Sequence, residues 1–256
     1  MSKKEKKPKV IKSVRLEEKG LTAYELKALA MFTMVLDHVA YIWWRPLGNW
    51  GQVMRVLGRF TFPLMVFLLT EGFIYTRSRY VYVIRIMITG MLSMLPFKLA
   101  FNENMLNVMF TLGAGLLILM AEDASIHRFS KVSPYAWQFI YLLVAGGTAY
   151  LMRDFDWGLP GVLAIYVTGQ LKHRPYWIQA FGCCGTLLLV TILRRIAQGR
   201  MFTTSYCIFI SGIVLAGIWI CLYNGRRGND RKYQKYAFYA FYPLHLLVLY
   251  MIRTIL

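Results

Sequence analysis

An aspartate and a histidine stand next to each other inside a long apolar stretch near the start of the chain. Asp37 and His38 lie in LKALAMFTMVLDHVAYIWW, residues 26–44. This stretch has the length of a membrane-spanning helix, and an aspartate at the centre of such a helix costs roughly 2.5–3.5 kcal/mol on insertion scales. Ionisable groups in that position usually face a protein interior or a wet cavity and mark a functional site. The alternative interpretation is a polar contact between helices that carries no chemistry.

Two further polar residues share a helix face with His38. Lys27 precedes it by eleven residues, so the two side chains point the same way about 16 Å apart along the axis. Tyr41 lies one turn beyond His38 on the same face. Because Asp37 points about 100° away from His38, we expect its carboxylate to pair with a basic group on another helix. The candidate partners are Arg59 and Lys98.

Four charged residues occupy the next two apolar stretches and the turn between them. They lie in GRFTFPLMVFLLTEGFIYTRSRYVYVIR. Glu71 is near the cytoplasmic end of the second apolar stretch, Arg77 and Arg79 follow in the turn, and Arg85 lies inside the third apolar stretch. Guanidinium groups bind phosphates through paired hydrogen bonds, so these arginines are candidates for an anion site. A plain topology signal explains Arg77 and Arg79 as well, but it does not explain Arg85.

Three polar residues in later stretches are candidates for the same cavity. Asn107 follows FNENML and could line it, whereas Lys98 is also explained by a side chain that reaches the far membrane interface. His245 follows Pro243, and it either packs against neighbours or brings a second imidazole to the cavity. The chain has no GxxxxGK, HExxH or paired CxxC motif, so we expect no metal site.

Membrane-spanning helices must position these residues. The chain has 256 residues, of which 57% are hydrophobic and 16% charged, whereas soluble domains carry about 25% charged residues. We therefore predict an all-α, polytopic membrane protein with about nine spanning helices, each of about 20 mostly apolar residues. They lie near residues 24–44, 57–76, 80–101, 106–122, 135–152, 158–171, 176–194, 204–223 and 236–255.

The net charge of +18 is explained by the membrane and not by nucleic acid. Basic residues favour an orientation with the N-terminus in the cytoplasm and the C-terminus outside. We predict a flexible basic cytoplasmic tail over residues 1–20 and a single integral-membrane domain over residues 21–256. The partners expected from charge alone are membrane lipids, with no nucleic acid among them.

Several blocks of the chain, in order, resemble the TraX family. These blocks are LTAYELKALAMFTMVLDHVAY, GRFTFPLMVFLLTEGFIYTRSRY, SMLPFKLAFNENMLNVMFTLGAGLL, WGLPGVLAIYV and FYAFYPLHLLVLYMIR. That family comprises membrane proteins associated with conjugation and known for N-terminal acetylation of F-type pilin. It is similar in turn to membrane acyltransferases that carry a basic residue, ten intervening residues and a histidine in the first span, as Lys27 and His38 do here. Those acyltransferases have an RxxR-like motif, whereas Arg77 and Arg79 form RxR, and they typically have ten spans.

The resemblance implies a multi-pass acetyltransferase of the bacterial cytoplasmic membrane that takes acetyl-CoA as its donor and uses no metal. The basic residues that would hold the phosphate end of the donor are Lys27, Arg77, Arg79 and Arg85. His38 would act as general base on the acceptor, or would itself carry the acetyl group as an acetyl-histidine. The polar network around it would include Asp37 and Glu71.

The acceptor is left open by the sequence, as is the class of the protein. A pilin-like peptide N-terminus, a glycan and a small molecule are all compatible acceptors at the outer face. A transporter or flippase for a small polar or lipid-linked solute is a second hypothesis, because intramembrane charges suit it. A non-catalytic assembly partner of a conjugation or secretion machine is a third.

Overall fold

The computed structural model describes residues 20–229 and 232–255. Within them the secondary structure is helical, with turns and loops between the helices and one isolated bridge between Leu21 and Tyr223. The tail predicted over residues 1–20 lies outside the described residues except for Gly20. The helices are α1 (Ala23–Ile42), α2 (Trp44–Gly58), α3 (Thr61–Tyr75), α4 (Arg79–Leu92), α5 (Met94–Phe101), α6 (Val108–Arg128), α7 (Pro134–Leu151), α8 (Gly158–Gln170), α9 (Tyr176–Ala197), α10 (Thr204–Cys221) and α11 (Lys232–Ile255).

The chain is a multi-pass membrane protein. Each of the nine predicted segments coincides with a helix, except that 80–101 contains both α4 and α5, which meet at a 43° bend. Five segments of the described chain are long and apolar enough to cross a membrane, or six if the bent pair counts as one span. They are Trp44–Tyr75, Val108–Arg128, Tyr176–Ala197, Thr204–Cys221 and Tyr236–Ile255. The count of nine spans stays a prediction.

Side-chain caps begin two of the helices that position the candidate site. Thr22 caps α1 by accepting a hydrogen bond from Glu25 N at 3.3 Å, while the Glu25 carboxylate accepts one from Thr22 N at 2.7 Å. Asn107 caps α6 by accepting from Met109 N at 3.1 Å. Such caps satisfy backbone groups that the first turn of a helix leaves unpaired.

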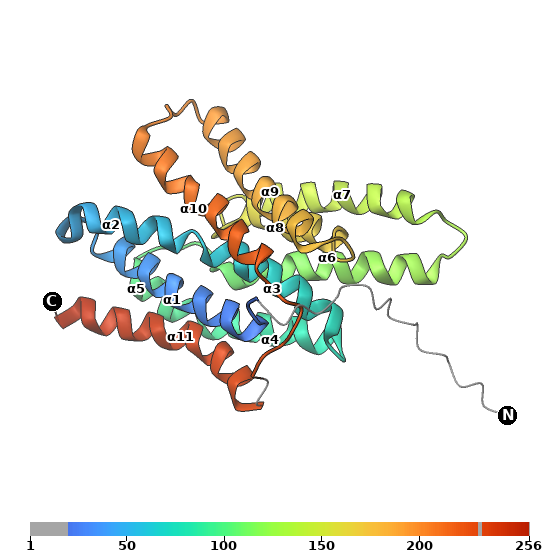
Figure 1. Cartoon of the computed structure of the whole chain (residues 1–256), viewed down its shortest axis with the longest axis horizontal. Helices are drawn as coiled ribbons and strands as arrows, with labels where there is room; N and C mark the ends of the chain where they lie inside the picture. The colour runs from blue at the N-terminus through green and yellow to red at the C-terminus, as the bar shows by residue number, and fades with distance from the viewer. Residues whose placement is uncertain (1–19, 230–231, 256) are drawn as a thin grey trace.

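Helix α3 lies at the centre of the bundle, with ten of its 15 residues buried (Figure 1). Around it, α9 and α10 form one hairpin, α6 and α7 form another antiparallel pair, and α11 packs beside α5 and α4. The outer helices expose large apolar side chains, among them Phe139, Phe181 and Val214. In a membrane protein such side chains face lipid, since the bilayer interior is itself apolar.

Helix α2 was not expected from the sequence, which places a connection there. It folds back on α1 and packs closely against it. The two helices are so close at Gly58 that a Cβ atom there would overlap the Asp37 side chain. A positive φ of 50° at Gly48 kinks the helix near its start. Pro46 and the glycines make this stretch look like a loop, although it continues through Arg59 into α3 as one apolar segment.

Segments predicted to be cytoplasmic come together at one end of the molecule. Leu21 N donates to Leu222 O at 2.7 Å, which joins the start of α1 to the end of α10. The guanidinium of Arg227 donates to Tyr75 O at 3.4 Å, which adds the end of α3 to the same end. These contacts join three of the segments that the predicted orientation places in the cytoplasm, but they do not test that orientation relative to the membrane.

Candidate functional site

A cavity of about 550 Å³ lies between α1, α3, α4, the α10–α11 connection and α11. Most of the charged side chains that line it are basic. Lys27 and Arg85 are half-buried within it, whereas Arg77 and Arg227 are exposed at its rim. Glu71 is the one acidic residue among the described residues that line it. The cavity therefore favours an anionic ligand.

Three of the four residues predicted to bind an anion line this cavity, and Arg79 does not. Arg79 forms an ion pair with Asp123 of α6, and its guanidinium lies 4.6 Å from the centre of the Phe73 ring. It is the first residue of α4, so its side chain points toward α6 and away from the cavity. Arg227, which the sequence marks only as a loop charge, takes a place at the rim instead.

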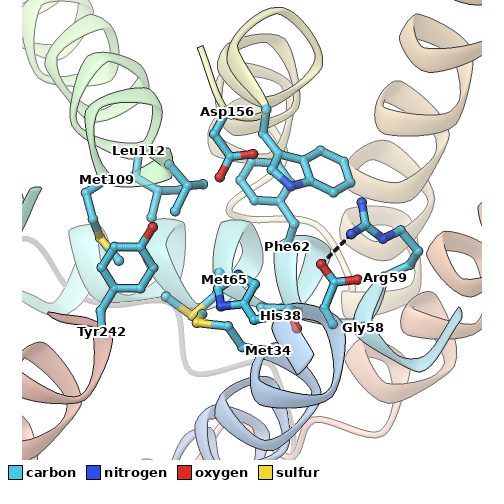
Figure 2. Close-up of a pocket in the computed structure, with 14 residues that line it drawn as sticks. Met34, His38, Gly58, Arg59, Phe62, Met65, Met109, Leu112, Asp156 and Tyr242 are labelled. Carbon is cyan, nitrogen blue, oxygen red and sulfur yellow. Dashed lines mark hydrogen bonds and ion pairs between the residues drawn. The ribbon is translucent and has the colours of Figure 1, made fainter. Parts of the chain in front are cut away.

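A smaller pocket, of about 40 Å³, lies at the inner end of the large cavity (Figure 2). His38, Asp37, Arg59 and Asp156 line this pocket. The two spaces share five lining residues, so they are neighbours along one path. The shared residues are Met34, Met65, Met109, Leu112 and Tyr242. The path leads from the basic rim, past apolar side chains, to His38.

His38 forms a pair with His245 of α11. His38 Nδ1 lies 2.9 Å from His245 Nε2, and the two rings are stacked with centres 5.0 Å apart. His245 Nδ1 lies 2.9 Å from Phe241 O, and because a carbonyl oxygen only accepts, we assign the proton of His245 to Nδ1. A neutral His245 then accepts at Nε2, so His38 donates from Nδ1 and keeps an unprotonated Nε2. That is the tautomer a general base requires.

Asp37 pairs with two arginines from the end of α2. Arg59 Nη2 lies 2.6 Å and Arg55 Nη1 2.9 Å from Asp37 Oδ2. The predicted pairing with Arg59 is confirmed, whereas Lys98 is exposed and forms no pair with Asp37. The Arg59 guanidinium also lies 4.5 Å from the centre of the Phe209 ring and 5.1 Å from that of Trp157. These contacts explain how a carboxylate is retained in an apolar segment.

Asp156 was not identified from the sequence, which shows it only as part of an outer loop, RDFDW. It lies in the turn between α7 and α8, and its backbone is held by Leu106 O at 3.0 Å and by the Thr111 hydroxyl at 2.8 Å. Burial raises the pKa of the Asp156 carboxyl to about 6, while nearby Arg59 acts in the opposite direction. The carboxyl lines the small pocket opposite Tyr242 and above His38 in Figure 2.

Three predicted cavity residues lie elsewhere. The Asn107 amide donates to Gly90 O at 2.9 Å and lines neither space, so its role is to cap α6 and fix it to α4. The Tyr41 hydroxyl donates to Glu103 at 3.1 Å, away from both spaces, although Tyr41 does share the helix face of His38. Lys98 is exposed on α5, as expected of a side chain that reaches an interface.

Comparisons with known proteins place the chain in a family. No solved structure matches it significantly. A curated relative from Dichelobacter nodosus, the probable fimbrial assembly protein FimC of serogroup H1, is 30% identical over 227 residues, covering 81% of this chain and 86% of the relative. The sequence profile described as TraX protein matches residues 23–253, which include every residue of the two cavities. The chain therefore belongs to the TraX family.

Proposed function

We propose that this protein is a transmembrane acetyltransferase that moves an acetyl group from cytoplasmic acetyl-CoA to an acceptor at the outer face of the bacterial cytoplasmic membrane. One observation supports it most: a histidine whose Nδ1 is hydrogen-bonded to a second histidine lines a small pocket that adjoins a cation-lined cavity. In this proposal the N-terminus and the basic rim are cytoplasmic, in agreement with the distribution of loop charges.

The large cavity suits the donor. Coenzyme A carries a diphosphate and a 3′-phosphate, and four cationic side chains line the cavity, two at its rim and two within it. These cations are Lys27, Arg77, Arg85 and Arg227. The pantetheine arm is thin and largely uncharged, which suits the apolar side chains of Met34, Met65 and Leu112 that line both spaces. The thioester would then lie beside His38.

The reaction we propose is direct transfer. His38 Nε2 removes a proton from the attacking amine or hydroxyl of the acceptor as that atom bonds to the thioester carbonyl carbon. The carbon–sulfur bond breaks, and the leaving thiolate takes the proton back from His38. His245 holds the imidazole in the required tautomer and orientation. Tyr242, which lines both spaces, is placed to donate a hydrogen bond to the carbonyl oxygen as negative charge develops there.

In this proposal the acceptor binds on the side of the small pocket that faces away from the large cavity. The ion cluster of Asp37, Arg55 and Arg59 lies there with Asp156. The Dichelobacter relative is named a fimbrial assembly protein, which supports a pilin-like peptide N-terminus as the acceptor in preference to a glycan.

The test is acetyl transfer by purified protein in nanodiscs, with labelled acetyl-CoA and a peptide that has a free N-terminus. We expect His38→Ala to lower the rate by about 100-fold to 10,000-fold, the range that general bases contribute. His127→Ala is the matched control, because that histidine is exposed at the end of α6 and far from both spaces. Unchanged transfer by a folded His38→Ala protein would refute the mechanism.

A further inference from the structure

Glu71 is a buried acid that the proposed mechanism does not use. It lies in the wall of the large cavity with only 6% of its surface exposed, held in place by the buried central helix α3. Its Oε2 atom has no hydrogen-bond partner among the residues that the structure describes. A buried carboxylate oxygen without a donor is unfavourable, and such atoms usually indicate a missing partner.

The surroundings of Glu71 define what that partner must be. A carboxylate only accepts hydrogen bonds, so the partner must carry an N–H or O–H group. The phosphates of an anionic ligand are repelled by Glu71 and attracted by the cations that line the same cavity. The cavity thus separates two kinds of ligand group, with anionic groups at the arginines and a hydrogen-bond donor at Glu71.

We propose that Glu71 recognises an N–H group of the bound acyl-CoA, an inference that rests on the proposed function. Two parts of that ligand carry N–H groups: the 6-amino group of adenine and the two amides of the pantetheine arm. The position of Glu71 favours adenine, since it lies one helical turn from Tyr75, whose carbonyl accepts from rim residue Arg227 at 3.4 Å. Tyr75 and Tyr223 line the cavity beside it and offer ring surfaces for the base.

The proposal predicts discrimination between two nucleotides by the unmodified protein. The probes are acetyl-CoA and its purine analogue, in which a hydrogen atom replaces the 6-amino group of adenine and no N–H group is left on that edge of the base. We expect the wild-type protein to bind acetyl-CoA about 10-fold more tightly than the analogue, because the analogue cannot form one hydrogen bond to a charged group. Binding is measured in nanodiscs of phosphatidylcholine, because the headgroup of that lipid carries no N–H or O–H group that could compete for Glu71.

The variant Glu71→Gln keeps the shape of the side chain and adds an amide donor. It should weaken binding of acetyl-CoA about 10-fold and abolish the preference over the purine analogue. Glu122→Gln is the matched control, because Glu122 is also buried but is hydrogen-bonded by Gln170 at 2.5 Å and Tyr166 at 3.3 Å, outside both spaces. This control should retain the wild-type affinity and preference.

A third probe, acetyl-phosphopantetheine, separates the two sources of the N–H group because it lacks the nucleotide. If the pantetheine amides are the partners, Glu71→Gln weakens binding of all three probes equally. If adenine is the partner, binding of acetyl-phosphopantetheine is unaffected. Equal binding of every probe by wild type and Glu71→Gln overturns the inference alone, whereas a folded wild-type protein that binds no acetyl-CoA overturns the proposed function with it.

Discussion

Replacing His245 tests whether the histidine pair sets the protonation of His38. His245→Phe keeps a flat ring that can stack at the 5.0 Å spacing but removes the acceptor 2.9 Å from His38 Nδ1. A hydrogen bond of this kind contributes about 1 kcal/mol net, so its loss lowers the population of the productive tautomer about 5-fold. Loosened orientation of the imidazole adds to this, and we expect the turnover rate to fall about 5-fold to 30-fold.

The assay is single-turnover acetyl transfer, measured beside equilibrium binding of acetyl-CoA. Affinity should stay within about 2-fold of wild type, because His245 lines neither space. His245→Gln carries an amide oxygen that can accept the same hydrogen bond, and it should recover part of the rate. A rate for His245→Phe equal to that of wild type would refute the tautomer assignment, and a rate as low as that of His38→Ala would show that His245 does more than orient its neighbour.

Other substitutions separate the cavity from the scaffold. Arg77→Ala should weaken acetyl-CoA binding about 5-fold to 10-fold through loss of a phosphate contact, and wild-type affinity in an isothermal titration would remove Arg77 from the site. Arg79→Ala should leave affinity unchanged but lower the free energy of unfolding by about 1 kcal/mol, since its half-exposed pair with Asp123 is broken; a loss of affinity would contradict this placement. Asp37→Asn leaves two arginines without a counter-charge and should lower the free energy of unfolding by about 3–5 kcal/mol. A thermal midpoint unchanged from wild type would show that the cluster does not stabilise the fold. Gly58→Ala places a methyl group against Asp37 and should also lower the thermal midpoint, because α1 and α2 must separate.

Local patterns in the sequence predicted the helices and part of the site. Runs of apolar residues located nine segments that are all helical, and the spacing of Lys27 and His38 placed them correctly on one side of α1 along the path of the two cavities. The need of Asp37 for a counter-charge gave two candidates, Arg59 and Lys98, and Arg59 is the partner in the structure. These successes rest on the length and periodicity of single helices, which are local properties.

Features that depend on contacts between distant segments escaped prediction. His245 was a candidate for a second imidazole at the cavity, but its pairing with His38 was not predicted, because the two residues are 207 positions apart and no sequence spacing reports their contact. Tyr242 lies in FYAFYPLH, where surrounding aromatic residues conceal it. Arg79 was misplaced because the turn of three residues between α3 and α4 decides whether an arginine at the start of α4 faces the cavity or α6.

Polar residues at helix ends were a second source of error. Asn107 is a polar residue in an apolar stretch, as expected of a residue that lines a cavity, but in the structure it caps α6. The residue pattern NVMF does not distinguish a helix cap from a cavity residue. Helix α2 was missed because Pro46, Gly48 and Gly51 suggest a loop. Its apolar residues could have revealed an amphipathic helix, and with it the position of Arg55 beside Asp37.

Direct binding of acetyl-CoA to the purified protein in nanodiscs tests the central claim most directly. We predict saturable binding by wild type, weakened in Arg85→Ala, whose side chain lies within the cavity, and retained in His38→Ala, whose side chain acts on the thioester and not on the nucleotide. A folded wild-type protein that binds no acetyl-CoA, yet moves a polar solute across liposomes, would contradict the acetyltransferase account and favour a transporter.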